Sequence, residues 1–334
     1  MIYAVKALRK IYAGEPATGR DVHHDAPLST LAFKQFQGTD AGYVAGQLFP
    51  PVAVDHETDR YYLIDPDSWL RIAPALRARR ASPARVEFRV SSDAYAVRGY
   101  ALAGEIALED LANQDRAIRL REQTTALVVN MLARDRENRV ASMVTSGTNL
   151  GSYVSLTGTA KWSDYTNSDP VSDVNSGHAF IESRTGLHAN TLVLDKDTYR
   201  VVRRHPAVLE AAFGPGRAQG LPAADRLAEV FEVDRILVAA GVKNVAAETA
   251  PASLVNIWGY NAILAYVPDA VAGLDAVAFG VSFTWKPEGF PEPMQVLTYR
   301  DPDPGRATEV IQVQYWADEK IVGKDLSYGI LGTL

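Results

Sequence analysis

The chain of 334 residues contains no cysteine. Disulfide bridges, thiolate catalysis and cysteine-ligated zinc are therefore excluded, and a covalent link between chains would need other chemistry. No run approaches the ~18 consecutive apolar residues of a membrane span. The segment 1–12 carries Lys6, Arg9 and Lys10 among its apolar residues and lacks the continuous apolar stretch of a signal peptide. We therefore expect no membrane partner and a protein that is made, and stays, in a cytoplasm-like solution.

A strong positive charge is also lacking. The formal net charge is -6, with 34 Lys and Arg against 40 Asp and Glu. This balance argues against a dedicated nucleic-acid reader with a basic surface, although it leaves weak contact with DNA open. The hydrophobic share of 47% is that of a globular protein, and the length indicates about two domains at roughly 150 residues each.

Catalytic and phosphate-binding motifs are missing as well. The sequence has neither a Gly-x-Ser-x-Gly nucleophile elbow nor a Ser-x-x-Lys pair. The stretch 214–220 is rich in glycine, but its spacing is wrong for a dinucleotide fingerprint, no Lys-Ser/Thr pair follows, and Pro215 interrupts it. We interpret it as a flexible loop and expect neither an enzyme nor a cofactor.

No metal site is predicted. The six histidines are scattered and none forms a His-Glu-x-x-His pair; they are His23, His24, His56, His178, His188 and His205. Asp164, Asp169 and Asp173 could gather around a hard cation, but they fit no EF-hand spacing. Capping of a helix by Asp169 and turn chemistry explain the cluster more simply.

The first half of the chain predicts extended structure followed by one long helix. Residues 48–104 contain β-rich runs around an arginine-rich stretch at 71–85, as expected for a long two-stranded excursion that must rest on another surface. Neither Gly nor Pro occurs from Glu105 through Ser146, and Gly147 supplies a stop. We predict a helix over 107–145, straight or with a break. Apolar residues recur at the helical period along one face of this helix, and we expect four more to widen that face: Leu120, Leu127, Val128 and Met131.

The second half predicts a compact α/β region and a β-rich tail. Residues 148–168 are expected to be a loop, and Asp169-Pro170 to open a helix that runs through Arg184 and ends at Gly186. Short strands and helices then alternate, with strands expected over 191–194, 235–239, 254–258 and 262–267, and helices over 196–204 and 206–213. The tail is expected to return to strands over 279–285, 296–299 and 309–316, with the stretch from Ile321 onward as a further candidate strand.

The order of these elements, together with several short stretches of sequence, resembles the major capsid proteins of tailed bacteriophages. The matching stretches run from about residue 45 to the end: Phe49 to Val54, Tyr61-Tyr62, Trp162 to Asp164, Ser168 to Asp173, Thr185 to Val193, His205-Pro206 and Val255 to Gly259. The resemblance implies an α+β protein of the Hong Kong 97-like phage capsid fold. It implies self-assembly into hexamers and pentamers of an icosahedral head around double-stranded DNA, within a virion built in the host bacterial cytoplasm.

The resemblance also implies a division of the chain. Residues 1–46 would be an N-terminal arm, 47–104 the extended loop with its root, and 105–189 a peripheral domain with the spine helix 107–145. Residues 190–275 would be the axial domain, and 276–334 the returning strands that complete the sheets. The 46 residues before the loop are too few for a large helical scaffolding domain. Scaffolding would then be a separate protein or absent; a portal, a decoration protein and the inner-face DNA are the other expected partners.

Lysine is absent between Lys34 and Lys161. The type member of the family cross-links its shell through a lysine in the extended loop, so we expect a non-covalent shell here. Arginines of the loop would pair with carboxylates of neighbouring copies. A solvated surface or nucleic-acid binding are the alternatives, the second weakened by the lack of aromatic residues between the arginines. The expected contact residues are Trp69, Arg71, Arg77, Arg79, Arg80 and Arg85.

Two other functions are the alternatives to a phage capsid protein. An encapsulin-like compartment would share the fold but enclose protein cargo, and neighbouring portal and terminase genes would argue against it. A soluble α/β enzyme built on residues 190–275 is the rival of a different class, and the empty search for a catalytic constellation speaks against it.

Overall fold

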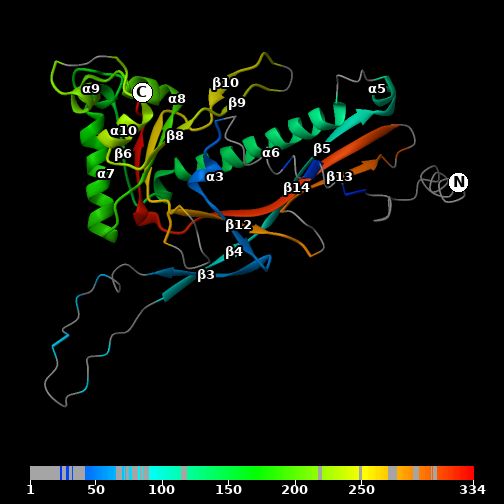
Figure 1. Ribbon diagram of the computed structural model, residues 1–334, viewed down its shortest axis with the longest axis horizontal. Coiled ribbons are helices and arrows are strands. Elements are labelled where there is room, and N and C mark those ends of the chain that lie inside the picture. The colour runs from blue at the N-terminus through cyan, green and yellow to red at the C-terminus, as the bar shows by residue number, and fades with distance from the viewer. Residues whose placement is uncertain are drawn as a thin grey trace, which may run out of the picture.

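A computed structural model describes the larger part of the chain. The described residues are 23–24, 28–29, 32, 42–64, 70, 72, 75–76, 82, 85, 90–113, 119–216, 220–247, 250–269, 277–288, 293–301, 303 and 307–334. Helices and strands are mixed along the chain, as the α+β prediction requires. Two sheets, joined by a long helix that runs across the molecule, give the protein an elongated shape (Figure 1).

The long helix is α6, Leu120–Val144. It is preceded by α5, Leu108–Asn113, while residues 114–118 lie outside the described part. The predicted helix is thus confirmed over both segments. Val129, Leu132 and Val140 are fully buried or nearly so on its inner face, whereas Leu127 and Met131, expected to widen the apolar stripe, are about half exposed. The apolar stripe is therefore narrower than the sequence suggests.

A six-stranded sheet lies along α6 and is built on the 14-residue strand β14, Thr308–Ile321. β5, Arg98–Ala107, pairs with β14 antiparallel over ten residues. β13, Met294–Arg300, and β12, Gly280–Trp285, also pair antiparallel with β14. β2, Pro51–Val54, runs parallel to β12, and the two-residue β1, His23–His24, adds to β13. The predicted return of the tail to strands is confirmed.

Gly104 of β5 brings this sheet close to the helix. A Cβ at this position would lie 2.4 Å from Cγ2 of Thr124 on α6, so only glycine allows the observed approach. Val128, Val129 and Leu132 of α6 pack there against Ile311, Val313 and Tyr315 of β14. Leu28 and Ala32 belong to the same core. These two residues of the segment 1–46 therefore pack against their own chain.

A five-stranded sheet forms the second region, in the order β6, β15, β11, β7, β8. Its bounds are β6 Ser152–Ser155, β7 Thr191–Asp195, β8 Arg235–Ala239, β11 Asn261–Ala265 and β15 Ser327–Leu331. The helices of this region are α7 Pro170–Thr185, α8 Lys196–Val202, α9 Pro206–Phe213 and α10 Ala224–Val230. They gather around this sheet at one end of the molecule (Figure 1).

The prediction that 148–168 is only a loop is wrong. β6 lies within it and pairs parallel with β15, a strand that follows it by about 170 residues. This pairing has no local signature, because SYVS is only four residues long and lies in a stretch rich in Gly, Ser and Thr. The predicted α7, with Asp169 before it and Gly186 after it, is confirmed: the Asp169 carboxylate accepts hydrogen bonds from the N–H groups of Val171 and Ser172, and Gly186 has a left-handed φ of 69°.

The remaining elements are small. β3, Thr58–Ile64, and β4, Val90–Ala96, form an antiparallel ribbon, and β9, Val242–Asn244, pairs with β10, Leu254–Asn256. α3 spans Ala45–Leu48. Short 3-10 turns lie at Gly147–Asn149, Gly158–Ala160 and Lys324–Leu326. Within the described residues, no helix is long and apolar enough to cross a membrane.

Candidate assembly elements: the β3–β4 ribbon and the spine junction

The β3–β4 ribbon leaves the body of the molecule from a fixed root (Figure 1). Tyr61 of β3 and Tyr95 of β4 lie on the same face of the ribbon and are almost completely buried. Both rings contact Phe283 of β12, with ring centroids 5.2 Å and 4.7 Å from it. Such aromatic contacts contribute beyond the area that they bury. The root is therefore packed against the six-stranded sheet and sets the direction of the ribbon.

Hydrogen bonds tie the same root to its neighbours. The Tyr61 hydroxyl donates to Asp93 at 3.0 Å, and the N–H of Ala96 donates to the Asp318 carboxylate of β14 at 3.0 Å. Burial, followed by the contact with Asp93, raises the pKa of Tyr61. The N–H of Ala94 and then the Tyr61 hydroxyl lower the pKa of Asp93. The phenol therefore stays protonated and keeps donating near neutral pH.

Apolar side chains beyond the root are exposed in the single chain. Tyr62 and Leu70 are at least half exposed, and Ile72 and Leu76 are exposed to 95% and 99%. Exposed apolar side chains in the segment that connects two strands of a ribbon are typical of a surface that contacts another one. Of the expected contact residues, Arg85 is described and exposed. The others lie outside the described residues: Trp69, Arg71, Arg77, Arg79 and Arg80.

Glu137 of α6 is completely buried and joins three parts of the chain. Its carboxylate accepts hydrogen bonds from the N–H groups of Val44 at 3.0 Å and Ala45 at 2.8 Å. It also accepts one from Nε1 of Trp258 at 2.5 Å. The residue thus caps the start of α3 from another element and holds the segment after β10. Burial raises the pKa of Glu137, and this effect outweighs the hydrogen bonds from the three donors, which lower the pKa.

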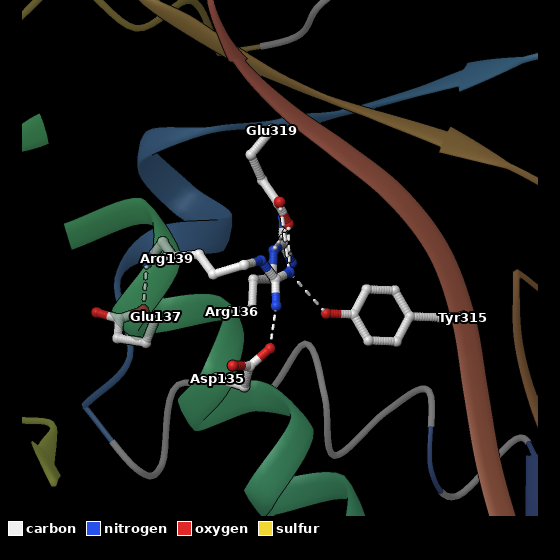
Figure 2. A network of polar contacts seen from close by, with 7 residues as sticks. Asp135, Arg136, Glu137, Arg139, Tyr315 and Glu319 are labelled. Carbon is white, nitrogen blue, oxygen red and sulfur yellow. Dashed lines mark hydrogen bonds and ion pairs between the residues drawn. The ribbon is translucent and has the colours of Figure 1, made fainter. Parts of the chain in front are cut away.

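Arg139, two residues after Glu137 on α6, fixes the helix to β14 (Figure 2). Its guanidinium donates to Glu319 at 3.1 Å and to the Tyr315 hydroxyl at 3.0 Å. It also pairs with Asp135 on its own helix and lies 3.8 Å from the centroid of the Tyr100 ring of β5. Burial raises the pKa of Tyr315 to about 12, so this hydroxyl remains a neutral partner. Because several contacts share one partly buried cation, the helix cannot slide along the sheet without breaking them together.

The acidic cluster and His205 have local roles. Asp169 caps α7, and Asp173 accepts a hydrogen bond from Nε1 of Trp162 at 2.8 Å. Asp164 accepts hydrogen bonds from the N–H groups of Thr166 and Asn167 in its own turn. The predicted capping and turn chemistry is thus confirmed. His205 caps α9 by accepting from the N–H of Ala207. Among the described residues, no group of three or more His, Asp or Glu side chains could hold a metal ion.

The spine junction, where Glu137 of α6 joins the start of α3 and Trp258, was not predicted from the sequence, although a signal exists. Glu137 lies four residues after Ala133, three before Val140 and seven before Val144, all on the buried stripe of α6. A single carboxylate at the centre of an apolar helical face predicts a buried polar contact. Its partners could not be predicted, because Val44 and Trp258 are 93 and 121 residues away.

Comparison with known proteins gives relatives over most of the chain. The major capsid protein of Pseudomonas phage JBD67 is 25% identical over 263 residues, which are 78% of this chain and 82% of that protein. No protein-family model matches. A phage-related protein of Bordetella bronchiseptica RB50 has a TM-score of 0.71 at 22% identity, over 93% of this chain and 97% of that one. A chain of the mature capsid of bacteriophage PhiM1 has a TM-score of 0.53 at 11% identity, covering 86% of each chain.

Proposed function

We propose that this chain, a relative of phage major capsid proteins with the Hong Kong 97-type fold, is the subunit that builds the icosahedral head of a tailed phage. The sequence relation to a named major capsid protein, which extends over most of both chains, carries this conclusion. The role is structural: copies of the chain associate into a closed shell and are part of the virion. We assign no catalytic step to it.

The shell would consist of hexamers and pentamers around double-stranded DNA, assembled in the host cytoplasm. A scaffolding protein, a portal and a decoration protein would be its further partners. The five-part division of the chain, from the arm at 1–46 to the returning strands at 276–334, stays a proposal. In it, the β3–β4 ribbon belongs to the extended loop and α6 is the spine.

The ribbon supports this proposal as a contact between copies. Its root is fixed by the two tyrosines that pack against Phe283, while Ile72 and Leu76 farther along are exposed in the single chain. A rigid root loses little conformational freedom when the far end binds, so more of the contact energy remains as affinity. Arginines of the 71–85 stretch would pair with carboxylates of a neighbouring copy, of which a chain with 40 acidic residues offers many.

Charge reversal tests this role of the loop. In the variant Arg79→Glu/Arg80→Glu we expect a large loss of assembled particles at unchanged folding of the subunit, because two attractive pairs become repulsive. The control Arg79→Lys/Arg80→Lys keeps the charge but loses the guanidinium fork, and should give an intermediate yield. Particle yield is measured by sedimentation and negative-stain electron microscopy. A normal particle yield from the double Glu variant would show that these two arginines do not take part in the contact between copies.

The shell-building function itself is tested by size-exclusion chromatography of the purified chain. We expect material of particle size that shows closed shells by negative stain. A monomer that forms no shells under any assembly condition would contradict the proposal. Particles that carry protein and no nucleic acid, when purified from infected or induced cells, would point to a compartment for protein cargo.

A further inference from the structure

Two histidines of the second region lie face to face. His178 on α7 and His188, just after α7, have ring centroids 4.2 Å apart with planes inclined by 7°. Both rings also contact the turn that joins α10 to β8. His178 Nε2 lies 2.9 Å from the carbonyl oxygen of Phe231, and His188 Nε2 lies 2.7 Å from that of Glu232. The pair therefore holds one end of α7 against this turn.

The hydrogen bonds assign one proton to His178. Only 4% of this residue is exposed. Nε2 must donate, because its neighbour is a carbonyl oxygen. Nδ1 is buried without a hydrogen-bond partner among the described residues. The ring is therefore neutral, with its proton on Nε2.

The hydrogen bonds assign two protons to His188. Its Nδ1 lies 2.6 Å from Oε1 of Glu182, and its Nε2 faces the Glu232 carbonyl. Both neighbours are acceptors, so both nitrogens donate and the ring is an imidazolium beside a carboxylate. A cationic ring thus stacks on a neutral one.

We propose that His178 and His188 form a one-proton latch, which holds the end of α7 on the turn between α10 and β8 only while the pair carries a single positive charge. Loss of that proton at higher pH leaves His188 with one donor for two acceptors and removes its ion pair with Glu182. A second proton at lower pH places two cations 4.2 Å apart. This inference rests on the fold and does not depend on the shell-building function.

The electrostatic surroundings agree with this assignment. The hydrogen bond to Glu182 raises the pKa of His188, whereas burial lowers the pKa of His178. The charged groups that face the pair are Glu182 on α7 and Glu232 on the turn, together with the rings themselves. The contribution of His188 to stability is present below the ordinary histidine value of ~6.5 and is lost as the pH rises through its raised pKa. The contribution of His178 to stability is lost as the pH falls from ~6.5 through its lowered pKa. The latch is therefore strongest near pH ~6.5.

Histidine C2 hydrogen–deuterium exchange with mass spectrometry tests the latch on the full chain, because it measures each histidine's pKa separately. We expect His188 to titrate above and His178 below the ordinary histidine value of ~6.5. In His188→Gln the pKa of His178 should rise toward that ordinary value, because the neighbouring cation is gone. The control His56→Gln should leave both values unchanged. Equal pKa values for the pair, or a His178 pKa that stays the same in His188→Gln, would overturn the proposal.

The thermal midpoint gives the second readout. Relative to the wild type, His188→Gln should lose about 2 °C or more near pH ~6.5, where the latch is strongest, and little above pH 8. A purely structural role of His188 would lower the midpoint equally at every pH. That parallel profile would contradict the latch even if the variant is folded.

Discussion

Replacing Glu137 by alanine would leave three buried donors without an acceptor, namely the N–H groups of Val44 and Ala45 and the indole of Trp258. Each unsatisfied buried group costs about 1–3 kcal/mol, and removal of one partner from a buried charged network costs about 3–5 kcal/mol in all. We therefore expect Glu137→Ala to lower the free energy of unfolding by about 4 kcal/mol. Glu137→Gln should lower it by about 1–2 kcal/mol, because one amide oxygen can still accept from Val44 and Trp258.

The assay is urea unfolding of the unassembled chain. With a slope of roughly 3 kcal/mol per M for a protein of this size, Glu137→Ala should shift the midpoint by about 1.3 M. The matched control is Glu122→Gln on the same helix, where Glu122 forms a solvent-exposed pair with Arg119 three residues earlier. That change should cost less than about 0.5 kcal/mol. A loss below about 1 kcal/mol for Glu137→Ala would refute the reasoning that this carboxylate holds the junction together.

The same residue gives a pH dependence. Burial raises the pKa of Glu137, so the unfolded chain ionises this group first as the pH rises. Its contribution to stability is therefore present below the ordinary glutamate value of ~4.3 and is lost as the pH rises through the raised value. The difference in stability between the wild type and Glu137→Gln should shrink over that window. A difference that is constant with pH would show that the carboxylate titrates normally.

Three further outcomes follow from the structure. Phe283→Ala should cost about 3–5 kcal/mol and speed the amide deuterium exchange of β3 and β4, since Tyr61 and Tyr95 lose their shared ring; unchanged exchange there would show that the root is held by other contacts. Asp169→Ala should destabilise the chain by about 1 kcal/mol, visible as a lower thermal midpoint, and an unchanged midpoint would contradict the capping role. Because the loop has no lysine, mature particles boiled in detergent should run as a single monomer band, and a ladder of linked subunits would contradict a non-covalent shell.

Local signals made α7 and α9 of the second region predictable, whereas α10 was not predicted. α9 occupies the predicted residues 206–213, because a proline opens it and a glycine follows it. α7 was predicted for the same reason, with Asp169 as its cap. Such signals act within one turn of the chain, so the sequence alone is enough to place them.

Long-range pairing accounts for most of what the sequence missed. β6 is a strand because β15 lies beside it, and the last residues of β14 extend past the predicted end to pair with β12. Leu127 and Met131 follow the helical period of α6 but remain about half exposed in the folded chain. In the candidate site, the arginine-rich stretch was visible as a pattern, whereas the partners of Glu137 depend on the tertiary fold.

Cryo-electron microscopy of the purified particle tests the central claim most directly. We predict a closed icosahedral shell in which each subunit has the fold described above, with α6 in its wall and the β3–β4 ribbon extending over a neighbouring copy. The exposed Ile72 and Leu76 should then be covered by that neighbour. Particles in which the ribbon lies against its own subunit and contacts no other copy would contradict the assembly role of the ribbon. Failure of the chain to form any closed shell would contradict the function as a whole.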